Sequence, residues 1–209
     1  MTAAIAALVL AAGRSSRSAP RHKLLAADAT GTPMVARTLR ALCASTVERV
    51  VVVLGHRAAD LRAAIDAHAP YARPIEVTIA ADHAAGLSAS LRAGLRAIGD
   101  PAPGGVLVCL GDMPTLNPLL VARLIARHRQ DNPPATIPCH GGHHGHPVLW
   151  DRTMIPHLMA LEGDRGGGAL IRALGPRAAI VAADETIHED FDTPDRLDRF
   201  AASSPAEGG

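Results

Sequence analysis

Residues 4–17 read AIAALVLAAGRSSR, an apolar run that passes through small residues into a basic segment. The part from Ala4 to Leu10 is continuously apolar, which is typical of a strand buried on both faces of a sheet. It is much shorter than the ~20 apolar residues that span a bilayer, and no basic region precedes it as in a signal peptide. We therefore interpret it as a buried first strand, and we expect a cytoplasmic protein with no membrane partner.

The composition of the 209 residues fits a folded globular protein. Hydrophobic residues make up 48% and charged residues 20%, and we expect a single domain over residues 1–200 with a disordered tail at 201–209. Aromatic residues are only 2% and the formal net charge is +1, so neither base stacking nor overall charge favours a nucleic acid as partner. The three cysteines form no CxxC pair, which argues against a disulfide framework or a structural zinc site.

Strand-like and helix-like stretches alternate along the chain after the first strand. A helical stripe of apolar residues follows Pro33, and a last helix is expected to begin near Pro194. The alternation predicts an α/β fold of three layers, with a mainly parallel sheet between helices. The other predicted strands are residues 50–54, 75–80, 105–110, 136–138, 148–150 and 178–182, and the other predicted helices are residues 58–68, 88–98, 118–129, 153–161 and 169–174.

The loop after the first strand, residues 10–17, combines small residues with positive charge. In a parallel sheet, ligands bind beyond the carboxyl ends of the strands, and small residues there let backbone N–H groups approach an anion. Arg14, Arg17 and the downstream Lys23 supply charge-assisted donors for phosphate oxygens. Neither GxxxxGK[ST] nor GxGxxG is present, so a solvated basic loop is the alternative to a phosphate site.

Two acidic motifs follow later in the chain. GDMP at residues 111–114 comes directly after a predicted strand, which places Asp112 where a hard cation such as Mg2+ can pair a carboxylate with phosphate oxygens. Asp190 and Asp192 lie two residues apart and would face the same side of an extended segment. Each motif also has a plain structural alternative, a turn with an N-cap at Asp112 and an N-cap before Pro194.

Two further segments combine glycine with polar side chains. Gly86 precedes Ser88 and Ser90 at a predicted helix start, where free N–H groups suit an anion or a base edge, although Ser88 as a plain N-cap is the simpler interpretation. Four histidines between residues 140 and 146 have the imidazoles that zinc prefers, but the glycines between them fix no geometry. We favour a mobile or substrate-facing loop for this segment over a zinc site.

The order of these motifs is more specific than any one of them. LAAG with SSR and Lys23, then Gly-Leu-Ser at a helix start, GDMP, GHPVLW, GDRGGG and DFDTPD together resemble the molybdenum cofactor nucleotidyltransferase family, and within it the cytidylyltransferase branch. The resemblance covers about residues 5–200, and departs at Ser18 and Ala19, where Met-Gly is usual. It implies a nucleotide-diphospho-sugar-transferase-like fold and an enzyme that moves CMP from CTP onto the phosphate of molybdenum-molybdopterin, releasing pyrophosphate.

The resemblance also implies roles for individual residues. The implied catalytic residues are Arg14, Arg17, Lys23 and Asp112, and the implied Mg2+ ligands are Asp112 and Asp192. The implied nucleotide-binding residues are Leu10, Ala11, Ala12, Gly13, Arg14, Lys23, Asp82, Gly86, Ser88, Ser90 and Asp112. The implied acceptor-side residues are His146 and Asp164.

Two other functions stay open on the sequence. The same fold can transfer a guanylyl or another nucleotidyl group from a different NTP to a different small phosphorylated acceptor. The chain could instead be a chaperone that binds the nucleotide or the finished cofactor and delivers it to a molybdoenzyme, although the basic loop and both acidic motifs count against pure binding. For a protein that handles the molybdenum cofactor, a molybdoenzyme or its chaperone is the expected protein partner.

Overall fold

The predicted first strand lies in the middle of the sheet in the computed structural model of the chain, which describes residues 4–99 and 104–204. Its neighbours on both sides run parallel to it, as predicted. The parallel strands are β1 (Ile5–Ala11), β2 (Arg49–Leu54), β3 (Ile75–Ile79) and β4 (Gly105–Leu110). Ala11 pairs with Leu54 and Leu10 with Leu110, so the carboxyl ends of β1, β2 and β4 lie at one edge of the sheet.

The whole sheet has eight strands in the order β3-β2-β1-β4-β7-β5-β6, with β8 paired to β5. The half beyond β4 is mixed. The strand β7 runs antiparallel to both β4 and β5, whereas β8 runs parallel to β5. These strands are β5 (Ala135–His140), β6 (His143–His144), β7 (Val148–Asp151) and β8 (Ala179–Ala182). The predicted mainly parallel α/β sheet is therefore confirmed, with antiparallel pairing confined to β6 and β7.

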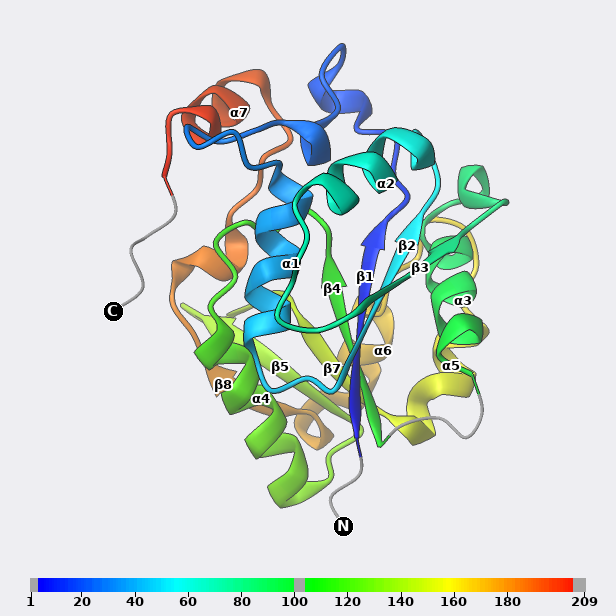
Figure 1. Ribbon diagram of the computed structural model, residues 1–209. Helices are drawn as coiled ribbons and strands as arrows, with labels where there is room; N and C mark the ends of the chain where they lie inside the picture. Colours follow the sequence, from blue (N-terminus) through cyan, green and yellow to red (C-terminus); the bar gives the residue numbers. More distant parts are fainter. Residues whose placement is uncertain (1–3, 100–103, 205–209) are drawn as a thin grey trace.

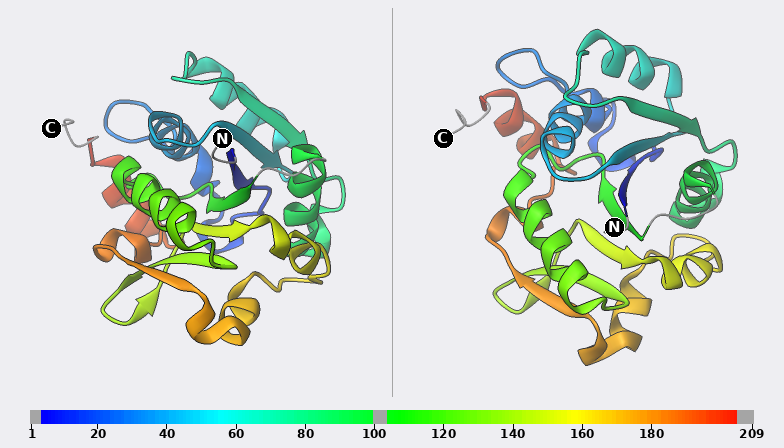
Figure 2. Two further views of the ribbon diagram at one scale, coloured as in Figure 1. Left: turned by 90° about the horizontal axis from the view of Figure 1, so that it is seen from below. Right: turned by 60° about the horizontal axis from the view of Figure 1, so that its bottom comes forward.

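Two helix layers cover the sheet because successive side chains of its buried strands point to opposite faces. One layer consists of α1 (Met34–Ala44), α2 (Ala58–Ala67) and α4 (Pro118–Asp131), and the other of α3 (Leu87–Ile98), α5 (Ile155–Met159) and α6 (Gly168–Leu174). The two layers can be followed from different directions in Figures 1 and 2. In β1, Ala7 and Val9 face the first layer, and Leu8 and Leu10 face the second.

The last helix, α7 (Pro194–Ala201), lies at the same end of the sheet as the loop after β1 (Figure 1). Its Leu197 and Phe200 pack on Met34 at the start of α1, which fixes the end of the chain to the first helix layer. Short 3-10 helices connect the main elements: η1 (Ser16–Ser18), η2 (Lys23–Leu25), η3 (His83–Ala85), η4 (Arg152–Met154), η5 (Gly175–Arg177) and η6 (Glu185–His188).

Two segments differ from the sequence-based expectation. The histidine-rich loop expected at residues 140–146 is partly a hairpin, in which β5 and β6 meet at Gly141 and Gly142 with φ of 57° and 82°. The backbone of Ser203 accepts a hydrogen bond from the Ala29 N–H at 3.0 Å, so the tail expected from residue 201 packs on the fold at its start. Residues 205–209 of that tail lie outside the described residues. No helix among the described residues has both the length and the apolar character needed to cross a membrane.

Candidate active site

The backbone around Asp112 is fixed by the strand beside it and by a buried threonine. The Gly111 N–H donates to the Leu10 carbonyl at 3.0 Å, and the hydroxyl of Thr38, on α1, donates to the Gly111 carbonyl at 3.0 Å. A Cβ at Gly111 would lie 3.2 Å from the Cβ of Ala11, which is tighter than most such contacts. The backbone position of Asp112 after β4 is therefore fixed. Asp112 lies at the edge of the sheet where the loop after β1 begins.

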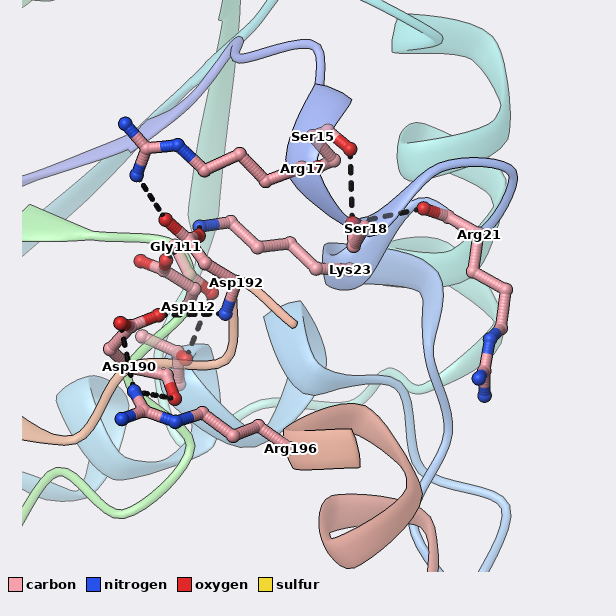
Figure 3. A network of polar contacts seen from close by, with 11 residues as sticks. Ser15, Arg17, Ser18, Arg21, Lys23, Gly111, Asp112, Asp190, Asp192 and Arg196 are labelled. Carbon is pink, nitrogen blue, oxygen red and sulfur yellow. Dashed lines mark hydrogen bonds and ion pairs between the residues drawn. The ribbon is translucent and has the colours of Figure 1, made fainter. Parts of the chain in front are cut away.

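Lys23 joins Asp112 to a second carboxylate from the far end of the chain. Its Nζ lies 2.5 Å from Oδ2 of Asp112 and 2.5 Å from Oδ1 of Asp192. Figure 3 shows the lysine reaching from η2 between the two acidic side chains. The three side chains are only 18–24% exposed, so this charge cluster is partly shielded from water. The structure thus brings together three residues that the sequence placed in one site.

Arg17 binds the remaining oxygen of Asp192. Its NH1 lies 2.6 Å from Oδ2 of Asp192, although the arginine side chain is 81% exposed. The neighbouring Asp190 does not join the cluster: it accepts from the Asp192 N–H at 2.7 Å and pairs with Arg196 at 2.8 Å (Figure 3). The two carboxylates, which would face the same side of an extended segment, therefore have different partners, and Asp190 pairs with Arg196 of α7.

The opposite charges of this cluster stabilise one another in their ionised forms. The hydrogen bond from Lys23, followed by its charge and by Arg17, holds the pKa of Asp192 below the ordinary carboxyl value. Burial acts to lower the pKa of Lys23, but Asp112 and then Asp192 outweigh it and raise that pKa above the ordinary lysine value. Lys23 and Asp192 are therefore charged throughout the neutral range.

These side chains line an open cleft of about 320 Å³, which we call the charged cleft. The cleft brings the loop after β1 together with the carboxyl end of β4 and the start of α3. Its lining is Leu10, Ala11, Gly13, Ser15, Ser16, Arg17, Lys23, Leu24, Leu87, Ser90, Leu110, Asp112 and Asp192. At Gly13, nothing lies within 4 Å of the place of a Cβ, so its backbone faces open space.

Several residues predicted for nucleotide binding do not line this cleft. Ala12 is buried, and its carbonyl accepts a hydrogen bond from the His56 N–H at 3.2 Å. This contact connects the loop after β1 to the segment after β2. Arg14 and Asp82 are exposed and lie outside the cleft lining. The fully buried Ser88 also lies outside it.

The start of α3 is capped from a distant loop, and the expected Ser88 cap is wrong. The helix begins at Leu87 after Gly86, whose φ of 107° suits glycine. The Leu87 N–H donates to the carboxylate of Asp164 at 3.3 Å, and the Ser88 N–H donates to the Gly163 carbonyl at 3.0 Å. Asp164 thus ties the GDRGGG loop to the start of α3.

A second, mostly apolar cavity of about 380 Å³ adjoins the charged cleft, and we call it the apolar cavity. The two share Leu10, Leu87 and Leu110. The rest of its lining is Leu91, Val108, His144, Gly145, His146, Val148, Trp150, Leu158, Gly166, Gly167, Gly168, Ile171 and Arg172. Burial lowers the pKa of the His146 imidazole, so the ring is neutral at pH 7. The structure places His146 in the apolar cavity, whereas Asp164 lies at the α3 start.

Sequence reasoning missed the residues that shape this cavity. Trp150 lies on β7 and Arg172 on α6, and both line the cavity. A Cβ at Gly167 would lie 2.3 Å from the Trp150 ring, so only glycine allows this close approach. The three consecutive glycines at 166–168 were the available signal, because such runs often allow another group to come close to the backbone.

The pair Asp112 and Asp192 fits Mg2+ better than zinc. Two carboxylates that open onto a cleft suit a hard cation that keeps several waters and takes its other ligands from phosphates. In the described part of the chain, no group of three or more histidine, cysteine, aspartate or glutamate side chains is arranged to hold a metal ion. The histidines of the hairpin are thus not gathered into such a group among the described residues.

The chain is similar in sequence and in fold to known proteins. A family model described as the MobA-like NTP transferase domain matches residues 7–179. The crystal structure of Rv0371c from Mycobacterium tuberculosis H37Rv is similar, with a TM-score of 0.79 and 26% identity over 96% of this chain and 98% of that one. A structure of Rv0371c in complex with manganese gives a TM-score of 0.73 and 25% identity over 96% and 99% of the two chains.

A curated relative, the bifunctional protein GlmU of Mycobacterium sp. (strain KMS), is 34% identical over 124 residues. These residues are 59% of this chain but 25% of GlmU. The chain therefore spans about a quarter of the length of that relative.

Proposed function

Since the chain belongs to the family of the MobA-like NTP transferase domain and is a nucleotidyltransferase, we propose that it moves CMP from CTP onto the phosphate of molybdenum-molybdopterin and releases pyrophosphate. The observation that carries the proposal is that the charged cleft and the mostly apolar cavity lie side by side. The charged cleft holds Arg17, Lys23 and two carboxylates, and the apolar cavity opens beside it across Leu10, Leu87 and Leu110. A triphosphate suits the first, and a flat acceptor suits the second.

In the charged cleft, the basic side chains would position the triphosphate. Arg17 and Lys23 would neutralise charge that develops on the pyrophosphate leaving group, and the open backbone at Gly13 would allow phosphate oxygens to approach closely. Arg14 is exposed on the same loop and would reach the outer phosphates. Asp112 and Asp192 would hold Mg2+, which when bound neutralises phosphate charge.

The acceptor would enter from the apolar cavity. Its phosphate is already anionic at neutral pH, so attack on the α-phosphorus needs no strong general base, and the protein contributes mainly by positioning both substrates. A neutral His146 and the apolar wall around Trp150 suit an aromatic, largely uncharged body. Ser90 lines the charged cleft near the shared wall, where it would contact the nucleotide.

The choice of CTP and of molybdenum-molybdopterin rests on the sequence motifs. The loop sequence LAAG and the DFDTPD motif resemble the cytidylyltransferase branch of the molybdenum cofactor family. The structure of Rv0371c in complex with manganese supports the use of a divalent metal. The likeness to GlmU keeps another NTP and another phosphorylated acceptor as the alternative.

A pyrophosphate-release assay with each of the four NTPs, run with and without molybdenum-molybdopterin, tests this function. We expect release with CTP, acceptor and Mg2+ together, and its loss in Asp112→Asn. Release with GTP as the only donor would overturn the cytidylyl assignment. A requirement for a partner protein before any pyrophosphate appears would favour the delivery chaperone.

Acceptor binding has an independent readout in Trp150, the only tryptophan of the chain. Its side chain is 2% exposed and lines the apolar cavity. A molecule that enters this cavity should therefore change the tryptophan fluorescence, whether or not any group is transferred. If molybdenum-molybdopterin saturates the enzyme without changing that fluorescence, the acceptor does not bind in the apolar cavity.

A further inference from the structure

We propose that Lys23 is a built-in counter-ion: its ammonium holds Asp112 and Asp192 together until a nucleoside triphosphate draws it onto the phosphates. The divalent metal would then enter with the nucleotide and not before it. The inference rests on the proposed nucleotidyl transfer and specifies the order in which metal and nucleotide reach that site.

The first support is the position of the ammonium between the two acids. Because Nζ lies 2.5 Å from an oxygen of Asp112 and 2.5 Å from an oxygen of Asp192, those oxygens are at most twice that distance apart. A Mg2+ ion binds oxygen at about 2.1 Å, so an ion on either of these oxygens would lie within about 5 Å of the ammonium. Two cations that close repel each other strongly in a partly shielded site.

The second support is the charge balance of the cluster. Lys23 and Arg17 carry two positive charges, and Asp112 and Asp192 carry two negative charges. Both oxygens of Asp192 already accept from a cation, Oδ1 from Lys23 and Oδ2 from Arg17. The closed cluster is therefore neutral, and its charge does not attract a free divalent ion.

The third support is that Lys23 can reach another partner without leaving the cleft. The lysine lines the charged cleft together with Gly13, Ser15 and Ser16 of the loop after β1. Its flexible four-carbon stem allows the ammonium to turn from the carboxylates to a phosphate in the same cavity. A triphosphate brings several negative charges, so it both attracts the ammonium and leaves the two carboxylates free for the metal.

Titration with Mn2+ in the absence of nucleotide, with free Mn2+ followed by electron paramagnetic resonance, tests this role. Wild type should bind Mn2+ weakly, and Lys23→Met should bind it roughly tenfold more tightly, because the competing charge is gone. The double variant Lys23→Met/Asp192→Asn should lose that gain, which would place the new ion on these carboxylates. Lys23→Gln, which keeps a neutral donor, serves the same purpose if Lys23→Met does not fold.

Arg21→Met is the matched control for a general loss of positive charge. Arg21 lies in the same loop but pairs with Asp198 at 2.8 Å, outside the cluster, so its loss should leave Mn2+ affinity unchanged. Equal Mn2+ affinity in wild type and in both Lys23 variants would overturn the inference, as would an equal gain in Arg21→Met. Since no turnover is measured, these outcomes do not depend on whether the protein transfers CMP.

Discussion

The ammonium of Lys23 lies 2.5 Å from the carboxylate of Asp192, although 169 residues separate them in the chain. The contact ties the loop after β1 to the segment before α7, and Arg17 adds a second tie to the same carboxylate. Arg21 of the same loop pairs with Asp198 on α7 at 2.8 Å. The site thus depends on residues from both ends of the described chain.

The substitution Asp192→Asn should reduce kcat/KM for nucleotidyl transfer by about 10²–10³, because the variant lacks a carboxylate that would hold the Mg2+ that neutralises phosphate charge. Steady-state pyrophosphate release at saturating Mg2+ measures this effect. Asp190→Asn is the control, since Asp190 contacts Arg196 and the Asp192 N–H but not Lys23. Equal losses in the two variants would mean that Asp192 acts only by shaping the segment.

The stability that Asp192 contributes should disappear in acid. Its pKa is lowered in the folded protein, chiefly by the hydrogen bond from Lys23. A group of this kind stabilises the fold above its unfolded-state pKa, and the contribution is lost as the pH falls through the folded-state pKa. Urea unfolding should therefore show wild type more stable than Asp192→Asn at pH 7, with the difference shrinking below about pH 4.

The stability that Lys23 contributes should depend on pH in the opposite direction, since it is lost at high pH. Its pKa is raised in the folded protein, so its contribution is complete at neutral pH and is lost only as the pH rises through the folded-state value. Between these limits, the difference between wild type and Asp192→Asn should stay constant. A difference that changed between pH 6 and pH 9 would contradict the assignment of the effect to this ion pair.

The sequence allows the sheet and one side of the site to be predicted. The continuous apolar runs of β1, β2 and β4 are typical of strands buried on both faces, and in a parallel sheet the polar residues after β1 and β4 meet at the carboxyl ends. Asp112 and Lys23 were found by this reasoning. The register of β1 and β4 brings Asp112 to the edge where the loop after β1 begins, and that loop carries Lys23.

The rest of the site depends on contacts that no local pattern encodes. Asp164 caps α3 across 77 residues, and a local capping rule pointed instead to Ser88. Trp150 and Gly167 meet because β7 runs antiparallel beside β4, a reversal that periodicity does not reveal. Asp190 and Asp192 have the same spacing as a paired ligand set, but Arg196 on α7 turns one of them away.

The buried hydroxyl of Thr38 should be needed to hold Asp112 in place. Its single O–H can donate to the Gly111 carbonyl at 3.0 Å or to the Met34 carbonyl, one turn back in α1, at 3.2 Å. Thr38→Val keeps the shape but leaves the Gly111 carbonyl without this donor, so the free energy of unfolding should fall by about 1–2 kcal/mol. Thr38→Ser, which keeps the hydroxyl, is the control in chemical denaturation, and it should retain more transferase activity than Thr38→Val at equal folded fraction.

A methyl group at Gly167 should close part of the apolar cavity. Its Cβ would lie 2.3 Å from the Trp150 ring, so the ring or the loop must move, at a destabilisation of about 1–3 kcal/mol. Gly168→Ala is the matched control, because the nearest atom to its Cβ is the guanidinium NH1 of Arg172 at 3.7 Å, an ordinary contact. Trp150 reports on both variants through its fluorescence.

We expect Gly167→Ala to shift the emission of Trp150 and to raise KM for the acceptor while leaving KM for CTP unchanged, since the charged cleft does not include residue 167. Gly168→Ala, whose Cβ meets only the Arg172 NH1 at 3.7 Å, should raise KM for the acceptor less and should also leave KM for CTP unchanged. This separation distinguishes a cavity that binds the acceptor from one that only supports the fold: a purely supporting role would lower kcat without raising KM for the acceptor. If KM for CTP rose as much as KM for the acceptor, the nucleotide itself would have to extend into the space beside Trp150.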